Sequence, residues 1–348
     1  MPYTMRDVGQ RIKRKTEQKN IRKTSDGQAV GATPTPPPGP VPAERGLSSR
    51  QVARVNPVVA AFALGLALAA QRVPAFQTGQ PFRTGVNTVP IYATVTDSRG
   101  ALVADLSAQD FEVEDDGRRR PITVFNRDVQ AMTIAILLDR SPSVFDVSQR
   151  LHTAVTELVQ RLLPADRASL GTFSHVVTLN PSLTSDHDAL IRHLGDDAPF
   201  PAGTALWDAV EAGRVAVAGE GGRRVVLIFT DAADNSSRLD IDDIRTALQK
   251  DGVMTYAVGV RGREGLETRE LTAIARATGG WYFELKPADD VAGRMQQIAD
   301  ELHRQYSIGF TPSALDDRMH RIVVKVKRPG LTVRARRAYF ASSKANVR

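Results

Sequence analysis

The chain of 348 residues contains no cysteine. This absence excludes disulfide bonds, cysteine-ligated zinc or iron–sulfur sites, a thiol nucleophile and the cysteine that carries a lipoprotein anchor. The chain also lacks any Gly-Lys pair, which excludes the P-loop of nucleotide hydrolases. Of its six histidines, no two lie four residues apart, so no helix offers the paired ligands of a zinc protease. The sequence therefore excludes thiol-dependent enzymes, P-loop nucleotide hydrolases and zinc proteases with paired helical histidines.

Excess positive charge is confined to the start of the chain. Residues 1–56 hold 11 Lys and Arg against 4 Asp and Glu, and the remaining residues hold 35 of each. The main part of the protein is therefore neutral overall, which argues against nucleic acid as a partner. Residues 33–42 read TPTPPPGPVP, a composition that cannot form a helix or a sheet. We expect residues 1–56 to be a disordered basic, proline-rich tail.

An apolar run follows this tail at residues 57–70 and is followed by small residues typical of a cleavage site. A helix of this length covers about 21 Å, less than the roughly 30 Å of a bilayer core. We therefore interpret residues 57–76 as a signal sequence or signal anchor. Two alternatives remain open: a cleaved signal whose true start lies nearer Arg50, or an uncleaved anchor to the inner membrane. Either way, we expect the rest to be exported, as a periplasmic or secreted protein.

Two flanking segments have the pattern of β-strands. In residues 85–128, apolar and polar residues alternate from Val89 to Thr96, and a hairpin signal at 115–117 predicts a returning strand at 122–125. In residues 306–340, strands are expected at 306–310, 321–327 and 331–336, the last two joined by a turn at 328–330. A sheet of about three strands is only marginally stable by itself, so we expect the two segments to pack together as one small β-sandwich.

Residues 129–305, between these flanks, alternate apolar runs with amphipathic helical patterns. The apolar runs lie at 132–138, 168–173, 225–229, 255–260 and 281–283. In the helical patterns, apolar residues recur at steps of three and four, as in Val291, Met295, Ile298 and Leu302. The fold class is therefore predicted as α/β, with a doubly wound, largely parallel sheet and a small flanking β-sandwich.

Oxygen-bearing side chains stand where these strands end, the edge at which open α/β sheets bind ligands. Asp139, Ser141 and Ser143 follow the first apolar run, and Asp231 follows the central one. Thr204 precedes a predicted helix between them. Two carboxylates and three hydroxyls suit Mg²⁺ or Mn²⁺, which prefer six oxygen ligands at about 2.1 Å. Two carboxylates do not fill such a shell, so we expect an open position that favours a carboxylate from another molecule.

The motifs Asp-x-Ser-x-Ser, Gly-Thr before a helix, and Thr-Asp after the central strand together resemble the von Willebrand factor type A (VWA) domain. The resemblance implies a metal-ion-dependent adhesion site at Asp139, Ser141, Ser143, Thr204 and Asp231. It implies direct metal ligation by the two serines, direct or water-mediated ligation by the threonine, and largely water-mediated ligation by the aspartates. The implied cofactor is Mg²⁺, or Mn²⁺ or Ca²⁺, and an acidic side chain of a protein partner completes the shell.

The flanking segments are similar to those of exported bacterial VWFA-related proteins. The similar motifs are Thr94-Val95-Thr96-Asp97, Asp110-Phe111, Glu114-Asp115-Asp116-Gly117, Gln305-Tyr306 and Arg328-Pro329-Gly330-Leu331. Pro142 and Ala232 stand where the VWA family commonly has glycine. In animal relatives the last helix moves when the metal site engages ligand; its counterpart here is the helix expected near residues 288–304.

Simpler structural interpretations compete with the metal site. Ser141, Ser143 and Thr204 could be helix N-caps, and Asp231 a turn residue with Asp234 and Asn235. We interpret the segment 186–188, Asp-His-Asp, as a helix start rather than a ligand cluster. Ser174-His175 lacks the glycine frame of a nucleophile elbow, so no catalytic residue is expected.

We therefore expect a non-enzymatic, adhesion-type interaction module that binds a protein carboxylate through the metal. The alternative is a structural or assembly protein of the cell envelope that does not use the metal site. The pattern does not set the oligomeric state.

Overall fold

The computed structural model describes residues 88–180, 182–192, 194, 200–231, 234–261 and 268–343. The predicted basic tail (1–56) and the predicted signal segment (57–76) lie outside the described residues. Within the described ranges, no helix combines the length and the apolar character needed to cross a membrane.

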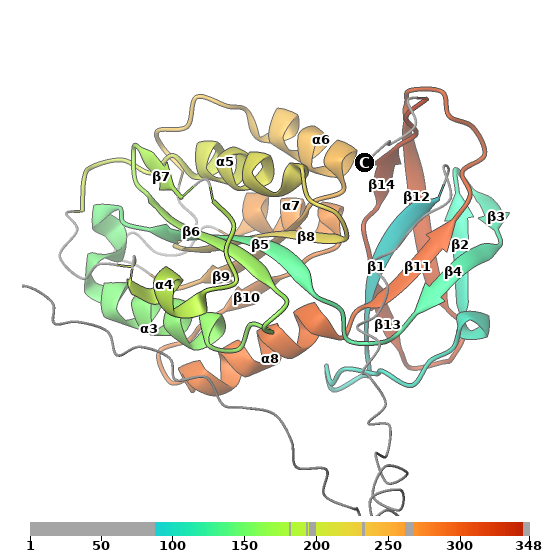
Figure 1. Cartoon of the computed structure of the whole chain (residues 1–348), viewed down its shortest axis with the longest axis horizontal. Helices are drawn as coiled ribbons and strands as arrows, with labels where there is room; N and C mark the ends of the chain where they lie inside the picture. Colours follow the sequence, from blue (N-terminus) through green and yellow to red (C-terminus); the bar gives the residue numbers. More distant parts are fainter. Residues whose placement is uncertain are drawn as a thin grey trace, which may run out of the picture. The chain divides into compact units, whose positions relative to one another are not determined.

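A six-stranded sheet occupies the middle of the sequence (Figure 1). Its strands are β5 (Met132–Asp139), β6 (Arg167–Phe173), β7 (Val177–Leu179), β8 (Arg223–Thr230), β9 (Met254–Gly259) and β10 (Tyr282–Glu284). The spatial order is β10-β9-β8-β5-β6-β7, and every neighbouring pair is parallel except β6 with β7. Every residue of β5 is buried, which explains why the central strands are continuous apolar runs rather than alternating ones.

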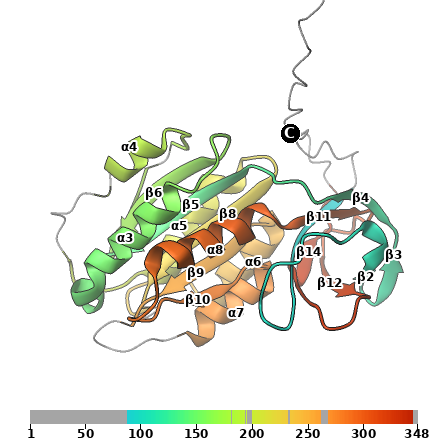
Figure 2. The ribbon, with the colours of Figure 1, turned by 90° about the horizontal axis from the view of Figure 1, so that it is seen from below.

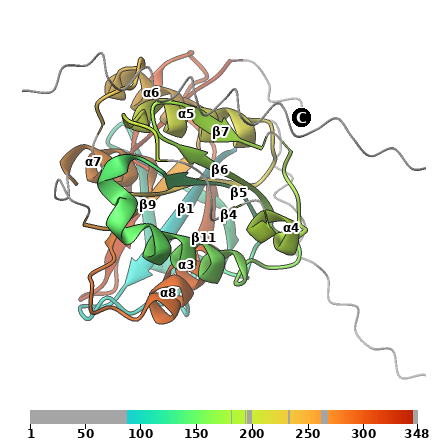
Figure 3. The same cartoon turned by 90° about the vertical axis from the view of Figure 1, so that its left-hand side faces the viewer.

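Helices cover both faces of this sheet, as Figures 2 and 3 show. The helices are α3 (Ser148–Val159), α4 (His187–Arg192), α5 (Leu206–Ala218), α6 (Ile241–Asp251), α7 (Arg269–Thr278) and α8 (Val291–His303). α3, α4 and α8 pack into one apolar core on one face, and α5, α6 and α7 into a second core on the other. In α8 the buried side chains include Met295, Ile298 and Leu302, as the spacing of apolar residues predicts.

The flanking segments form two four-stranded sheets with a shared apolar core. One contains β1 (Val89–Thr96), β4 (Ile122–Asn126), β11 (Tyr306–Phe310) and β13 (Thr332–Arg334); the other contains β2 (Phe111–Asp115), β3 (Arg118–Arg120), β12 (Met319–Val326) and β14 (Ala338–Phe340). A short 3₁₀ helix, η1 (Ala108–Asp110), precedes β2. Antiparallel pairs join the amino-terminal and carboxyl-terminal flanks: β1 with β11, and β2 with β12.

The predicted fold class, α/β with a flanking β-sandwich, is confirmed. The predicted hairpin is wrong in one respect: β2 is followed by β3 at residues 118–120, whereas residues 122–126 pair with β11 in the other sheet. Pro121 lies between β3 and β4 and has no N–H to continue the ladder, so the chain changes sheets there. The turn at 328–330 likewise connects two sheets, since β12 pairs with β2 and β13 with β1.

A buried polar network joins the end of α8 to strands of both parts. The carboxylate of Glu301 accepts hydrogen bonds from the Tyr256 hydroxyl (3.0 Å) and from the Arg334 guanidinium (2.7 Å). These partners lie on β9 and β13 respectively. Strands β4 and β11 are also direct neighbours, with Asn126 opposite Ser307, although the whole six-stranded sheet lies between them in the sequence.

Candidate metal centre

The five residues singled out from the sequence lie on loops at the carboxyl edge of the six-stranded sheet. Asp139 ends β5, and Asp231 directly follows the neighbouring parallel strand β8. Ser141 and Ser143 lie at the start of a 3₁₀ helix, η2 (Pro142–Val147), and Thr204 lies two residues before α5. Each of the five has 7% or less of its surface exposed.

The first loop folds around the carboxylate of Asp139. Its Oδ1 accepts a hydrogen bond from the backbone N–H of Ser141 (2.7 Å), and its Oδ2 accepts one from the Thr230 hydroxyl (2.6 Å). The hydroxyl oxygens of Ser141 and Ser143 lie 3.0 Å apart. Pro142 occupies the first position of η2, where a missing N–H costs nothing, so the departure from glycine is accommodated. Three candidate ligands are thus brought together within one turn.

The alternative interpretation of these residues as helix caps finds little support in either loop, because Ser141 occupies an N-cap position without a capping bond, Ser143 lies inside η2, and Thr204 is not at the N-cap of α5. Ser141 precedes η2 but its side chain makes no capping hydrogen bond. The residue at the N-cap position of α5 is Ala205, not Thr204, and it has no side chain that could cap the helix.

Thr204 is fixed by the loop that follows Asp231. The backbone N–H of Thr204 donates to Oδ1 of Asn235 (2.8 Å), and its carbonyl accepts from the N–H groups of Asn235 (3.0 Å) and Ser236 (3.1 Å). Gly203 has φ +91°, and a Cβ there would lie 2.5 Å from the Ser236 hydroxyl oxygen and 3.0 Å from Cβ of His175. The Gly-Thr pair is therefore held by contacts that leave no room for a larger residue.

The same loop caps α5 from a distance. Asp234 Oδ1 accepts from the N–H of Leu206 (2.8 Å) and from the hydroxyl of Ser237 (2.6 Å), and Ser237 Oγ accepts from the N–H of Trp207 (2.9 Å). Sequence analysis considered Asp234 and Asn235 only as turn residues, in the alternative to the metal site, and missed this role. The signal was available: a helix that begins after Ala205 has no capping side chain of its own, so its first N–H groups need acceptors from elsewhere.

Electrostatics at this edge favour a bound cation. Burial raises the pKa of Asp139 to about 6, although the hydrogen bonds from Thr230 and Ser141 act in the opposite direction. The negative charge of Asp231 raises the pKa of Asp139 further, which places the two carboxylates within electrostatic range of each other. A divalent cation would stabilise both ionised carboxylates, and the paired serine hydroxyls add neutral oxygen donors. The residues present therefore fit the metal that the VWA resemblance implies.

Other polar clusters have structural roles. Asp186 Oδ1 accepts from the N–H of Ala189 (2.9 Å), so the segment 186–188 starts α4, as predicted. The carbonyl of Ser174 accepts from the N–H of Ala205 (2.6 Å), which ties the loop after β6 to the start of α5.

A second cluster, in the β-sandwich, was not found from the sequence because its members lie about 200 residues apart. His320 places Nδ1 3.2 Å from Asp115 and 3.0 Å from Asp116, and Nε2 3.0 Å from Asp316. The geometry of Asp115, Asp116 and His320 could hold a metal ion. However, both oxygens of Asp115 already accept hydrogen bonds, from His320, Tyr339 and Ser313. This arrangement is that of a buried ion-pair network.

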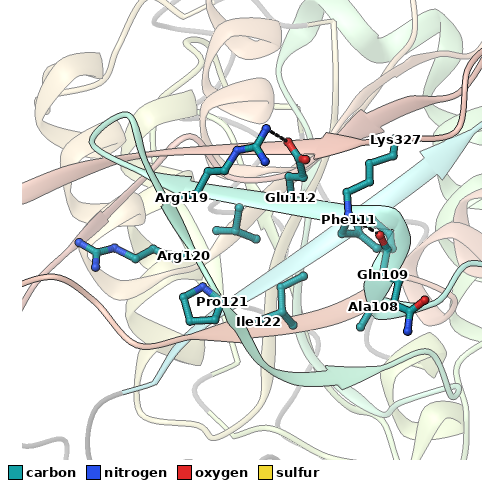
Figure 4. Close-up of a pocket in the computed structure, with 10 residues that line it drawn as sticks. Ala108, Gln109, Phe111, Glu112, Arg119, Arg120, Pro121, Ile122 and Lys327 are labelled. Atoms are coloured by element: carbon teal, nitrogen blue, oxygen red, sulfur yellow. Dashed lines mark hydrogen bonds and ion pairs between the residues drawn. The ribbon is translucent and has the colours of Figure 1, made fainter.

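A pocket of about 310 Å³ lies on the β-sandwich, between η1, β2 and the β3–β4 connection. Figure 4 shows the residues that line it. Its cationic side chains are already engaged: Arg119 lies 3.1 Å from Glu112, and Lys327 donates to the Gln109 carbonyl (2.7 Å). The pocket therefore offers no free charge that compares with the cluster at the sheet edge.

Comparison with known proteins gives a clear domain assignment. Residues 133–301 match the family model of the von Willebrand factor type A domain. No curated protein matches the chain. Among solved structures, the conserved hypothetical protein BatB from Bacteroides thetaiotaomicron is 18% identical, covering 49% of this chain and 97% of BatB, with a TM-score of 0.42.

Two further solved structures are similar. An aerotolerance-related membrane protein from Bacteroides fragilis is 19% identical, covering 49% of this chain and 98% of that chain, with a TM-score of 0.43. A von Willebrand factor type A protein from Catenulispora acidiphila is 11% identical, covering 77% of this chain and 79% of that chain, with a TM-score of 0.44. The family match identifies residues 133–301 of this chain as a von Willebrand factor type A domain.

Proposed function

We propose that this chain is an exported, adhesion-type interaction module that binds an acidic residue of a partner protein through a divalent cation. VWA domains are in general protein-interaction modules, and the domain match supports this broader function. The metal-dependent form of the proposal rests on one observation: Asp139, Ser141 and Ser143 are buried together in one turn, beside the end of the strand that leads into Asp231.

In this proposal the hydroxyls of Ser141 and Ser143 bind the cation directly, and Thr204 binds directly or through water. Asp139 acts largely through metal-bound water. Each of its carboxylate oxygens already accepts one hydrogen bond and retains a lone pair, which can accept from such a water. Asp231 supplies the second negative charge.

This donor set determines the chemistry of the partner. Hydroxyls and two carboxylates leave positions in a six-coordinate oxygen shell open and do not over-neutralise a divalent cation. An acidic side chain of another protein provides the missing ligand and binds the cation directly, whereas the aspartates of the site act largely through water. Mg²⁺ or Mn²⁺ is the proposed cofactor ahead of Ca²⁺, because Ca²⁺ usually takes a larger number of ligands, with more carboxylates among them.

We further propose that the module is not an enzyme and that it acts outside the cytoplasm, in the periplasm or as a secreted protein. The proposed location rests on the apolar run at residues 57–70 and the small residues after it. If that segment remains attached, the module is tethered to the inner membrane.

Metal binding to the purified full chain tests the proposal. A ligand that binds only the folded state at 100 times its Kd stabilises that state by about 2.7 kcal/mol, which raises the melting temperature by several degrees. We expect this shift with Mg²⁺ or Mn²⁺ and its loss in Asp139→Asn and Asp231→Asn. Asp243→Asn, at an exposed position on α6, is the matched control and should keep the shift.

Absence of any shift at millimolar metal in the wild-type protein would contradict the metal site. The structural or assembly role, in which the domain packs without metal, would then become the leading function.

A further inference from the structure

The described residues contain seven large apolar side chains that are exposed to solvent. Three of these lie on the loops that follow β5, β6 and β8, which are neighbours in the sheet. They are Phe145 (54% exposed), Val176 (56%) and Leu239 (41%). The same three loops carry or fix the candidate metal ligands. We name Phe145, Val176 and Leu239 the apolar rim.

Each rim residue is tied to the candidate site by a short segment. Phe145 lies two residues after Ser143 within η2. Val176 follows His175, whose Cβ lies against Gly203, and the carbonyl of Val176 accepts from the N–H of Ser174 (3.1 Å). Phe145 and Val176 therefore lie on loops that position the candidate ligands.

Hydrogen bonding anchors the loop of Leu239, and ring packing holds Phe145 in place. The N–H of Leu239 donates to Oδ1 of Asp208 on α5 (3.2 Å). The ring of Phe145 packs edge-on against the ring of Phe200, with 5.1 Å between the ring centroids. Phe200 also contacts Arg140, whose guanidinium carbon lies 4.6 Å from the centroid of the Phe200 ring. Phe145 is thus held in a defined position although half of its surface faces solvent.

We propose that the apolar rim is the specificity surface of the module, and that its partner presents a carboxylate flanked by apolar side chains. The inference rests on the proposed function, because the metal at Asp139, Ser141 and Ser143 captures the carboxylate. Exposed apolar side chains gathered around a polar site are characteristic of protein interfaces, in which the surrounding contacts exclude water from the central charge pair. A cation at the sheet edge that carries the apolar rim complements an anionic group that has apolar neighbours.

Surfaces coated with synthetic peptides provide the test, since a high local concentration of peptide favours rebinding of a protein whose single contacts are weak. Three peptides differ only at the centre: Leu-Asp-Leu, Ser-Asp-Ser and Leu-Asn-Leu, each between identical Gly-Ser spacers. The purified full chain is passed over each surface in Mg²⁺ or Mn²⁺ and again in EDTA. We expect at least tenfold more retention on Leu-Asp-Leu than on either other peptide, and loss of that retention in EDTA.

Variants of the rim separate specificity from metal binding. Val176→Ser and Leu239→Ser should each reduce retention on Leu-Asp-Leu at least threefold while keeping the metal-induced shift in melting temperature. Phe145→Ser should do the same, although its contact with Phe200 makes the other two the safer tests. Val215→Ser is the control, because Val215 is 59% exposed but lies on α5 away from these loops.

The outcomes distinguish the two proposals. A metal shift with equal retention on all three peptides, including none, would overturn the apolar rim and leave the metal site intact. Absence of the metal shift in the wild-type chain would overturn the metal site and, with it, the capture of a flanked carboxylate.

Discussion

The hydroxyl of Thr230 donates a hydrogen bond of 2.6 Å to Oδ2 of Asp139, linking the ends of the two central parallel strands β8 and β5. Replacing Thr230 with valine keeps the side-chain shape and removes this bond. Loss of a partner that orients a metal-site carboxylate typically lowers metal affinity by about 10- to 100-fold. We expect a weakening in that range for Thr230→Val, measured by calorimetric titration with Mn²⁺. Thr230→Ser retains the hydroxyl and should bind like the wild-type protein; equal affinity of the valine variant would show that the bond does not act on the metal.

In the metal-free protein, the titration of Asp139 should make the free energy of unfolding depend on pH. Its pKa is about 6 in the folded state and about 3.9 in an unfolded chain, so the folded state holds this proton more tightly. The free energy of unfolding therefore falls as pH rises from about 4 to about 6, by on the order of 3 kcal/mol from this group. Urea unfolding in EDTA across this range measures the effect. The difference between wild type and Asp139→Asn should change with pH in this direction, and a constant difference would contradict the prediction.

Gly203 should be the least replaceable glycine of the site. Alanine at φ +91° is strained, and its Cβ would meet the Ser236 hydroxyl at 2.5 Å. We expect Gly203→Ala to destabilise the fold by about 1–3 kcal/mol and to weaken metal binding, because Thr204 is displaced. The matched control is Gly219→Ala at the end of α5, where a Cβ meets nothing within 4 Å and φ is −74°. Thermal unfolding of both variants, with and without Mg²⁺, would show whether the effect is confined to Gly203.

The His320 cluster should stabilise the β-sandwich at mildly acidic pH. Burial alone would lower the pKa of His320, but the hydrogen bonds to Asp316 and Asp115 and the charge of Asp116 outweigh it and raise the pKa above its ordinary value. A raised histidine pKa contributes stability that is fully present below about 6.5 and is lost as pH rises through the folded-state value. Melting temperatures of His320→Gln and wild type should therefore differ most near pH 5.5 and converge above neutrality. A gap that widens with pH would contradict this assignment.

Local patterns in the sequence were sufficient for the central sheet. Strand β5 is buried on both faces and so is a continuous apolar run, and α8 shows its buried face as Met295, Ile298 and Leu302 at helical spacing. Because parallel strands end at a common edge, the residues after β5 and β8 could also be placed together before any coordinates. The fold class and the position of Asp139 relative to Asp231 follow from these two rules.

Contacts between distant segments were not predictable in this way. The capping of α5 by Asp234 and Ser237 depends on the folded positions of two loops, and the pairing of β2 with β12 brings Asp115 to His320 across 205 residues. Pro121 illustrates the same limit on a short scale. A proline between two strand-like segments reads as a break in one strand, and only the packed structure shows that the chain enters the opposite sheet.

The pairing of β4 with β11 makes the α/β domain an insertion between two adjacent strands of one sheet. The sandwich cannot close until residue 306 and the strands after it have been synthesised, whereas the α/β domain has its strands and helices earlier in the chain. Once that domain has folded, it holds the ends of β4 and β11 close together and replaces the closure of a long flexible loop with that of a short one. We therefore expect the α/β domain to act as the folding template for the sandwich, so that damage to its core should delay or prevent assembly of the sandwich strands.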